Sequence, residues 1–335
     1  MKHRFLLPFF TAALLLQGCA TMKAKRPATL GPANGTLVIV GGGMMSKVIF
    51  DRFFAAAGGR DAKIVVVPGA GSAAEYDKST SSVKMFKRAG ATDVHLLHTR
   101  DRDVANSDEF VVVLRDAKAV WFGGGRQWRL VDAYLGTKTE TAIHDVLKRG
   151  GVIGGSSAGA TIQGSYLLRG APEGNQIMMS PGHEKGFGYI RNSAIDQHLL
   201  ARKRENDMLP VIRKHPHLLG IGIDESTALF VRGNTAEVIG KSKVLFYDIA
   251  LEKTVGEKFY TMLDPGERYE QGKSKAKRND ERGRLRAGPM EIGERQPQPG
   301  TAGPGQAPGD PAHGDADAKQ QEQNRADRAQ NRRGE

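Results

Sequence analysis

Short apolar runs alternate with amphipathic segments along the first half of the chain. The runs are rich in β-branched and aromatic residues, which fit the pleated surface of a buried strand. These predicted strands are Thr36–Val40, Lys63–Val67, Asp93–His98, Ala119–Phe122 and Val152–Ile153. Apolar residues at helical spacing predict the helices between them, which are Val48–Ala57, Ser79–Ala89, Arg129–Leu135 and Thr139–Lys148. This alternation predicts an α/β fold, a doubly wound and mainly parallel sheet with helices on both faces.

The pattern is less regular elsewhere. Ser107 is expected to cap a helix that runs to Asp116, although the apolar run Phe110–Leu114 also suits a strand. A charged helix is predicted over Leu199–Lys214, and Leu219–Glu225 is predicted as a further buried strand that ends in two carboxylates. Three short runs then predict a small C-terminal β meander, with strands at 227–231, 235–240 and 243–248. Residues 271–335 have almost no apolar side chains, so we predict a disordered polar tail.

The N-terminus has the pattern of an export signal. Basic residues precede the apolar run Phe5–Leu16, which is too short for a stable membrane-spanning helix. Residues 1–18 are therefore predicted as a signal peptide. They end in Leu-Gln-Gly before Cys19, the only cysteine, which resembles a bacterial lipoprotein processing site. We expect Cys19 to be lipidated, with residues 19–34 as a tether. Ordinary secretory cleavage is the alternative.

A lipid anchor predicts a location in the bacterial cell envelope. Residue 20 is Ala, so no acidic inner-membrane retention signal follows Cys19. The expected place is the outer membrane or the periplasmic side of a membrane, with release outside the cell as the alternative. Acyl chains make the membrane itself a partner of the protein.

The charge distribution argues against nucleic-acid binding. The formal net charge is +12, but much of the basic excess lies in residues 1–30 and 271–335. Between those ends there are 31 basic and 27 acidic residues, which is close to balance. A globular domain that binds nucleic acid needs a basic surface of its own, and the composition gives little support for one. The basic ends leave open binding of an anionic envelope polymer.

Glycine-rich turns follow four of the predicted strands, after Val40, Val67, Phe122 and Ile153. The carboxyl ends of parallel strands meet at one edge of a sheet, where ligands bind in such folds. The first turn resembles a dinucleotide-binding loop, but Ser46 stands where the third glycine or alanine is needed. No acidic residue ends the second strand at the usual distance either. We therefore predict no nucleotide cofactor.

The turn after Ile153 contains a candidate nucleophile. Gly155–Gly159 fits the pattern G-x-S-x-G, with Ser157 at its centre, between a predicted strand and a predicted helix. The pentapeptide alone also suits a plain Gly/Ser turn. A serine nucleophile needs a base and an acid that orients the base. Among nine histidines, His198 begins a predicted helix after Asp196 and Gln197, and His183, in a Gly/Pro loop, is a weaker candidate.

Motifs in a fixed order resemble the cyanophycinase and dipeptidase E family of serine peptidases. They are Ser157–Ala160 after two glycines, Asp196–His198, and Gly220–Leu229, and the similarity runs from roughly residue 35 to 247. The resemblance implies a sheet like that of class I glutamine amidotransferases, with a catalytic domain over 35–270. It also implies a triad of Ser157 as nucleophile, His198 as base and Glu225 as acid. Gly125 and Ala158 would form the oxyanion hole, and no metal or organic cofactor is needed.

The resemblance also implies a substrate. Cyanophycinases cleave poly-aspartate that bears β-linked arginine and release β-aspartyl-arginine. Positions matching their substrate-binding residues are Gln127, Asp196, Gln197, Arg202 and Arg204. Asp207 stands where the family has a further arginine, and Arg126 where an uncharged or acidic residue is usual.

These departures leave other β-aspartyl or acidic peptides open as substrates. A non-catalytic surface binding protein with the same fold is the alternative of another class. The resemblance also suggests a homodimer, on which the sequence itself is silent.

Overall fold

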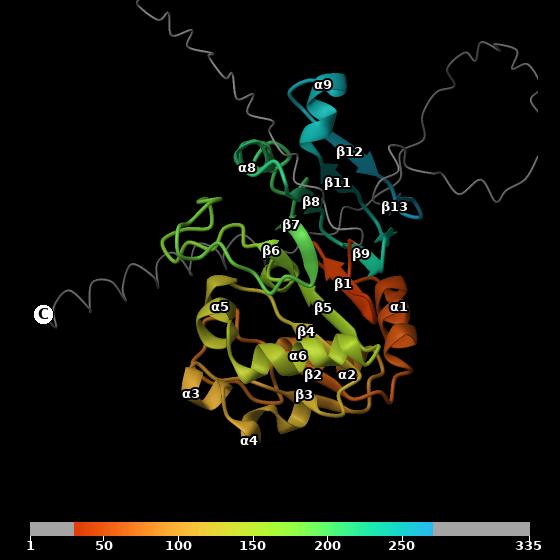
Figure 1. Cartoon of the computed structure of the whole chain (residues 1–335). Coiled ribbons are helices and arrows are strands. Elements are labelled where there is room, and N and C mark those ends of the chain that lie inside the picture. Colours follow the sequence, from red (N-terminus) through yellow and green to blue (C-terminus); the bar gives the residue numbers. More distant parts are fainter. Residues whose placement is uncertain (1–29, 271–335) are drawn as a thin grey trace, which may run out of the picture. The chain divides into compact units, whose positions relative to one another are not determined.

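The computed structural model describes residues 30–270, which form two β-sheets with helices around them (Figure 1). The predicted signal peptide, Cys19 and the predicted tail lie outside the described residues. No helix in the described part of the chain is both long and apolar enough to cross a membrane.

The larger sheet has eight strands and confirms the predicted fold class. Its parallel part contains, in spatial order, β1 (Thr36–Val40), β5 (Val152–Ser156), β4 (Ala119–Phe122), β2 (Ile64–Val67) and β3 (Val94–Leu96). Beyond β1 the sheet continues with three antiparallel strands, β9 (Thr227–Arg232), β10 (Thr235–Gly240) and β13 (Arg268–Glu270). Continuous apolar runs form these central strands because both faces of the sheet are covered.

Helices cover both faces of this sheet. On one face, α1 (Lys47–Ala57) and α2 (Ser81–Arg88) pack through Phe53 and Phe86 against Trp121 of β4, with ring centroids 5.7 and 5.3 Å away. On the other face, α5 (Trp128–Tyr134) and α6 (Lys138–Lys148) bury Leu130 and Ile143 with alternate strand residues. Three short helices contact this second layer: α3 (Arg102–Ala105), α4 (Asp108–Val111) and the 3₁₀ turn η1 (Val112–Leu114).

The second sheet was not predicted. Its order is β12 (Tyr260–Leu263), β11 (Val244–Tyr247), β8 (Leu219–Ile223), β7 (Ile190–Gln197) and β6 (Gly164–Tyr166). Strands β6, β7 and β8 are parallel. Ile195, Ile221 and Phe246 join the apolar cluster of the larger sheet, while α8 (Met208–Lys214) covers the opposite face. The remaining elements are α7 (Ala158–Thr161), η2 (Ile249–Leu251) and α9 (Glu252–Val255).

The predicted β meander is divided between the two sheets. Strands β9 and β10 form a hairpin at the edge of the parallel strands, whereas β11 pairs with β8 and β12.

The expectation of a helix over Leu199–Lys214 is wrong in its first half, which forms turns. His198 and Lys203 have φ of 52° and 53°, which a continuous helix does not allow. The run Phe110–Leu114, which also suited a strand, is helical and lies in α4 and η1. The Ser107 hydroxyl caps α4 by accepting the Phe110 N–H at 3.2 Å.

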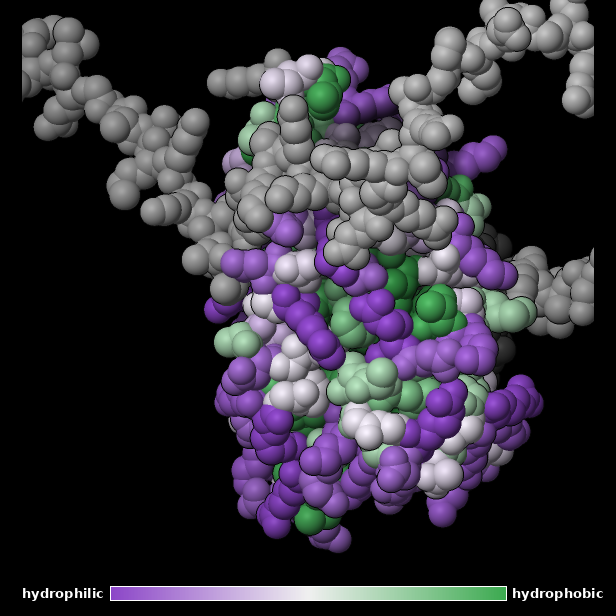
Figure 2. Space-filling model, turned by 90° about the vertical axis from the view of Figure 1, so that its right-hand side faces the viewer, coloured by the Kyte–Doolittle hydropathy of each residue, from purple (hydrophilic) through white to green (hydrophobic). Residues whose placement is uncertain are grey.

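A shallow groove of about 510 Å³ runs beside α1. Its apolar lining includes Met44, Met45, Phe50 and Met85, and Met44 is 82% exposed. Figure 2 shows the side of the molecule that faces right in Figure 1, where apolar residues lie among polar ones. Neither Ser157 nor His198 lines this groove.

Candidate active site

Ser157 lies on a sharp turn between β5 and α7. Its φ of 57° and ψ of −116° are unusual for a residue with a side chain. Glycine is needed on both sides because the turn packs tightly. A β-carbon at Gly155 would lie 2.2 Å from the Gly159 carbonyl oxygen, and one at Gly159 would lie 2.2 Å from that of Phe122. The G-x-S-x-G pattern thus forms a nucleophile elbow here. The predicted end of the strand at Ile153, with a glycine turn directly after it, is wrong, because Gly154 and Gly155 also pair within β5.

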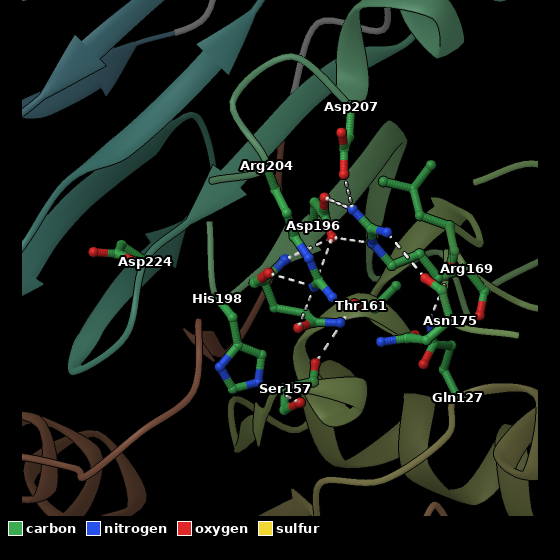
Figure 3. Close-up of polar contacts among 12 residues, drawn as sticks. Gln127, Ser157, Thr161, Arg169, Asn175, Asp196, His198, Arg204, Asp207 and Asp224 are labelled. Carbon is green, nitrogen blue, oxygen red and sulfur yellow. Dashed lines mark hydrogen bonds and ion pairs between the residues drawn. The ribbon is translucent and has the colours of Figure 1, made fainter. Parts of the chain in front are cut away.

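Ser157, His198 and Glu225 form a continuous hydrogen-bonded chain. Nδ1 of His198 lies 2.5 Å from Oε1 of Glu225, and Nε2 lies 2.9 Å from the Ser157 hydroxyl. Figure 3 shows the imidazole turned toward Ser157. With the Nδ1 proton held by the carboxylate, Nε2 is the acceptor for the serine proton. The geometry is that of a Ser-His-acid triad.

The three side chains come from two sheets. Ser157 follows β5 of the larger sheet, whereas His198 follows β7 and Glu225 comes shortly after β8 in the second sheet. Each therefore lies at the carboxyl end of a strand in a parallel set, the edge at which sites form in α/β sheets. The sequence predicted the edge but not the second sheet that contributes two of the residues.

Unusual backbone conformations gather around this site. Within residues 30–270, six residues other than glycine have positive φ. Ser157 and His198 are two of them, and Ser226, which follows Glu225, is a third. Arg169 and Lys203 are also among them. Such conformations persist where surrounding contacts enforce them, and they are common at active sites.

The glycine turn after β1 holds the base and the acid. The His198 N–H donates to the Gly41 carbonyl at 2.8 Å, and the Ser226 N–H donates to the Gly42 carbonyl at 2.8 Å. A β-carbon at Gly42 would lie 2.2 Å from Cε1 of His198. The sequence showed only a partial nucleotide-binding pattern here. In the structure this turn supports the imidazole instead.

The resemblance assigns Gly125 and Ala158 to an oxyanion hole, which stays a prediction. Gly124 packs against the nucleophile, since a β-carbon there would lie 3.5 Å from Cβ of Ser157. Ala158 is the first residue of α7, so its N–H has no partner within that helix. Across the described residues, the N–H groups of Gly125 and Ala158 make no hydrogen bond. Both remain free to donate to an anion.

Burial and charge shift the pKa of His198. Burial lowers it below its usual value of 6.5, and the positive charge of Arg202 lowers it further. The hydrogen bond and the charge of Glu225 oppose this shift without cancelling it. The imidazole is therefore neutral, and able to accept a proton, at neutral pH.

A buried arginine that sequence reasoning missed, Arg169, holds together a network of charged side chains near the triad. Arg169 lies between β6 and β7, and its guanidinium donates to Asp196 through Nε at 2.9 Å and Nη2 at 2.8 Å. Nη2 also donates to Asp207 at 2.7 Å (Figure 3). Burial alone would lower the pKa of Arg169, but these two carboxylates raise it above its ordinary value. A lone arginine after the apolar residues Tyr166–Leu168 was the available signal.

Four of the five residues predicted to bind substrate are buried: Gln127, Asp196, Gln197 and Arg204. Gln127 donates through Nε2 to the carbonyls of residues 168 and 169, and Arg204 donates to the carbonyl and side-chain oxygens of Gln197. Burial and the charge of Arg169 lower the pKa of Arg204 to about 10. Arg202 is exposed. In this structure the buried four bond to other groups of the protein, and their contact with substrate stays a prediction.

Asp224 has a supporting role that the sequence did not reveal. Its Oδ1 accepts the N–H groups of Leu200 and Ala201 at 3.0 and 2.9 Å, and its Oδ2 accepts the Ser242 hydroxyl at 2.6 Å. Asp224 therefore fixes the turn that follows His198, while its neighbour Glu225 contacts the imidazole.

His183, the weaker candidate base, pairs with Asp132 at 3.1 Å instead of with Ser157. Over residues 30–270, no group of three or more His, Cys, Asp or Glu side chains is placed to hold a metal ion.

Comparisons with known proteins identify the family of the chain. The sequence profile of peptidase family S51 matches residues 37–239, and the chain belongs to that family. It is 34% identical over 223 residues to the cyanophycinase of Geminocystis herdmanii, covering 64% of this chain and 81% of that protein. It is 32% identical over 229 residues to the cyanophycinase of a Nostoc species, covering 64% and 74%. The predicted resemblance is confirmed, and the chain is a serine peptidase.

A solved structure supports the fold. The crystal structure of a peptidase from an acI-B1 Actinobacterium has a TM-score of 0.55 and 23% identity. The match covers 72% of this chain and 98% of that one. It shows that the arrangement of strands and helices is shared.

Proposed function

We propose that this peptidase hydrolyses cyanophycin and releases β-aspartyl-arginine, with Ser157, His198 and Glu225 as its triad. The hydrogen-bonded chain from Glu225 through His198 to Ser157 is the observation that carries the proposal. The substrate is supported by relatives called cyanophycinases at 34% and 32% identity. Other β-aspartyl or acidic peptides are the alternative substrates. Asp207 stands where the family has a further arginine, and its carboxylate pairs with Arg169.

The proposed reaction has two halves. His198 takes the Ser157 proton as the hydroxyl oxygen attacks the scissile carbonyl carbon, and the oxyanion accepts N–H bonds from Gly125 and Ala158. The C–N bond then breaks, and His198 gives its proton to the leaving amine. In the second half, His198 takes a proton from water as the water oxygen attacks the acyl carbon. His198 then returns the proton to the Ser157 oxygen, and the carboxylic acid product leaves. Proton transfer by a positioned histidine contributes roughly 10²–10⁴-fold to such rates.

The direct test is hydrolysis of cyanophycin by the full-length chain purified in detergent. We expect release of β-aspartyl-arginine, measured by mass spectrometry. Ser157→Ala should reduce release to background because, within residues 30–270, no other hydroxyl is bonded to His198. Ser156→Ala is the matched control and should keep activity. Release that persists in Ser157→Ala would contradict the proposed nucleophile, and activity only on other β-aspartyl peptides would overturn the substrate alone.

We also propose that Cys19 anchors the enzyme to the bacterial cell envelope. The support is the export signal pattern that ends at this single cysteine. Mass spectrometry of the mature N-terminus should find a lipid-modified Cys19, and Cys19→Ser should move the protein from the membrane fraction to the soluble one. A mature N-terminus elsewhere would contradict the anchor.

A further inference from the structure

The two helices on one face of the larger sheet carry an uneven charge. Residues 47–60, which contain α1, and residues 81–88, which form α2, have six basic side chains and one acidic one. The basic residues are Lys47, Arg52, Arg60, Lys84, Lys87 and Arg88, and the acidic one is Asp51. Helices α5 and α6 on the opposite face have three of each sign. We call the outer surface of α1 and α2, together with residues 43–46 before α1, the basic face.

Asp51 does not neutralise the basic face. Its carboxylate accepts Nζ of Lys47 at 2.6 Å and Nη2 of Arg60 at 2.9 Å, so two cations share one anion. Lys87 and Arg88 are exposed in the last turn of α2. Within residues 30–270, neither of them forms an ion pair or a side-chain hydrogen bond. The basic face therefore has cations available for an anionic partner.

Apolar side chains protrude from the same face. Met44 is 82% exposed, the highest value for a large apolar residue in the described part of the chain. Val48, in the first turn of α1, is 47% exposed. Met44 also lines the groove beside α1, together with Lys47, Arg60 and Arg88. On the side of the molecule shown in Figure 2, apolar residues lie among hydrophilic ones. Exposed apolar residues beside basic ones are typical of surfaces that bind anionic membranes.

The described chain begins next to the hairpin on which α1 packs. The Leu30 N–H donates to Oδ1 of Asn234 at 3.1 Å, in the turn between β9 and β10. Three residues further along, Glu237 of β10 pairs with Arg52 of α1 at 3.1 Å. Cys19, the predicted lipid attachment site, precedes Leu30 by eleven residues, which span at most about 40 Å. A lipid on Cys19 would thus keep the basic face within reach of the membrane.

We propose that the basic face docks on the surface of an anionic lipid bilayer. Met44 and Val48 enter the headgroup region, and Lys47, Lys87 and Arg88 contact lipid phosphates. The inference rests on the proposed envelope location and is independent of the substrate.

Other occupants fit the basic face less well. A second copy would bring two basic faces together, because a symmetric contact pairs the same surface of both chains. A polyanion without apolar groups would leave Met44 and Val48 in water. A bilayer offers both anionic phosphates and an apolar layer beneath them, which matches the two kinds of side chain on this face.

Quenching of tryptophan fluorescence by brominated lipid tests contact of the face itself. Val48→Trp and Val112→Trp place a reporter at two sites of similar exposure, 47% and 49%, in opposite helical layers. Each full-length variant is reconstituted with vesicles of phosphatidylglycerol and brominated phosphatidylcholine, and the wild-type signal of Trp121 and Trp128 is subtracted. Val48→Trp should be quenched, and Val112→Trp should not. Vesicles of brominated phosphatidylcholine alone should quench Val48→Trp less, because they have no net charge.

Removal of charge gives the matched comparison. Each basic residue near an anionic bilayer strengthens binding by about fivefold, so Lys87→Gln with Arg88→Gln should weaken docking by about 25-fold and reduce the quenching. Lys138→Gln with Lys148→Gln removes the same charge from α6 on the opposite face and should leave the quenching unchanged.

Equal quenching at both reporters would overturn the proposal, as would quenching that does not depend on phosphatidylglycerol or on Lys87 and Arg88. Emission of Val48→Trp that changes with protein concentration in detergent, without vesicles, would place a second copy on the face and overturn the bilayer as its partner. Selective quenching of Val48→Trp in a Cys19→Ser background would support the face even where the proposed anchor fails. A lipid-modified Cys19 with equal quenching at both reporters would support the anchor and overturn the face.

Discussion

At the scale of single residues, the charge beside His198 controls the pH at which the base can act. His198 must be neutral to accept the serine proton, so the rate falls as pH drops through its pKa. The Arg202 charge lowers that pKa by disfavouring imidazolium. Arg202→Gln should therefore raise the pKa and move the acidic limb of the kcat/KM profile to higher pH. Lys203→Gln is the neighbouring control. An unchanged limb, or a shift to lower pH, would show that Arg202 does not act on the base.

The ion pairs of Arg169 give a prediction about stability. Arg169 and Asp196 are both wholly buried, whereas the Asp207 side chain is 37% exposed. Arg169→Met should lower the free energy of unfolding by about 3–5 kcal/mol, because it removes both guanidinium bonds from the buried Asp196 carboxylate. Asp196 then keeps only the Gln197 N–H at 3.0 Å and the more distant Arg204 guanidinium at 3.9 Å. Asp207→Asn should cost less, since Asp196 still pairs with Arg169. Urea unfolding measures both. Equal losses would show that burial of Asp196 is not the decisive factor.

At the scale of elements, the turn after β1 should be as important as the nucleophile elbow. Gly42→Ala would place a methyl group on the His198 ring and strain a backbone with φ of 128°. We expect kcat/KM to fall by about 10²-fold or more, because moving a catalytic side chain by about an ångström is enough for that loss. Gly58→Ala is the control, since Gly58 also has positive φ but has no neighbour within 4 Å of the added carbon. Similar activity in both variants would argue against the supporting role of the turn.

Elements with a strong local signal were predictable from the sequence. Strands β1 and β4 were predicted to the residue, because uninterrupted apolar runs indicate burial on both faces. Strand β7 was missed since polar residues such as Arg191 and Asn192 weaken its pattern. The charged segment after His198 suits a helix by composition, but long-range contacts to Asp224 hold it in turns. Arg169 was missed because its partners lie 27 and 38 residues away in sequence.

At the scale of the whole described domain, the site lies where two sheets contribute to one place. The larger sheet supplies Ser157 and the turn that contains Gly124 and Gly125, and the second sheet supplies His198 and Glu225. The shared apolar cluster, which includes Ile153 and Ile221, joins the two sheets. The motifs predicted the triad by their order, but no sequence feature showed that its members belong to different sheets.

Covalent labelling of the nucleophile tests this account most directly. A fluorophosphonate reacts with a serine that a neighbouring base activates, and mass spectrometry identifies the modified residue. We predict that the full-length chain is labelled at Ser157 and not at Ser156, and that His198→Ala abolishes labelling because Nε2 is the group bonded to the hydroxyl. Absence of label at Ser157 in the folded wild-type protein, or labelling that survives His198→Ala, would contradict the triad.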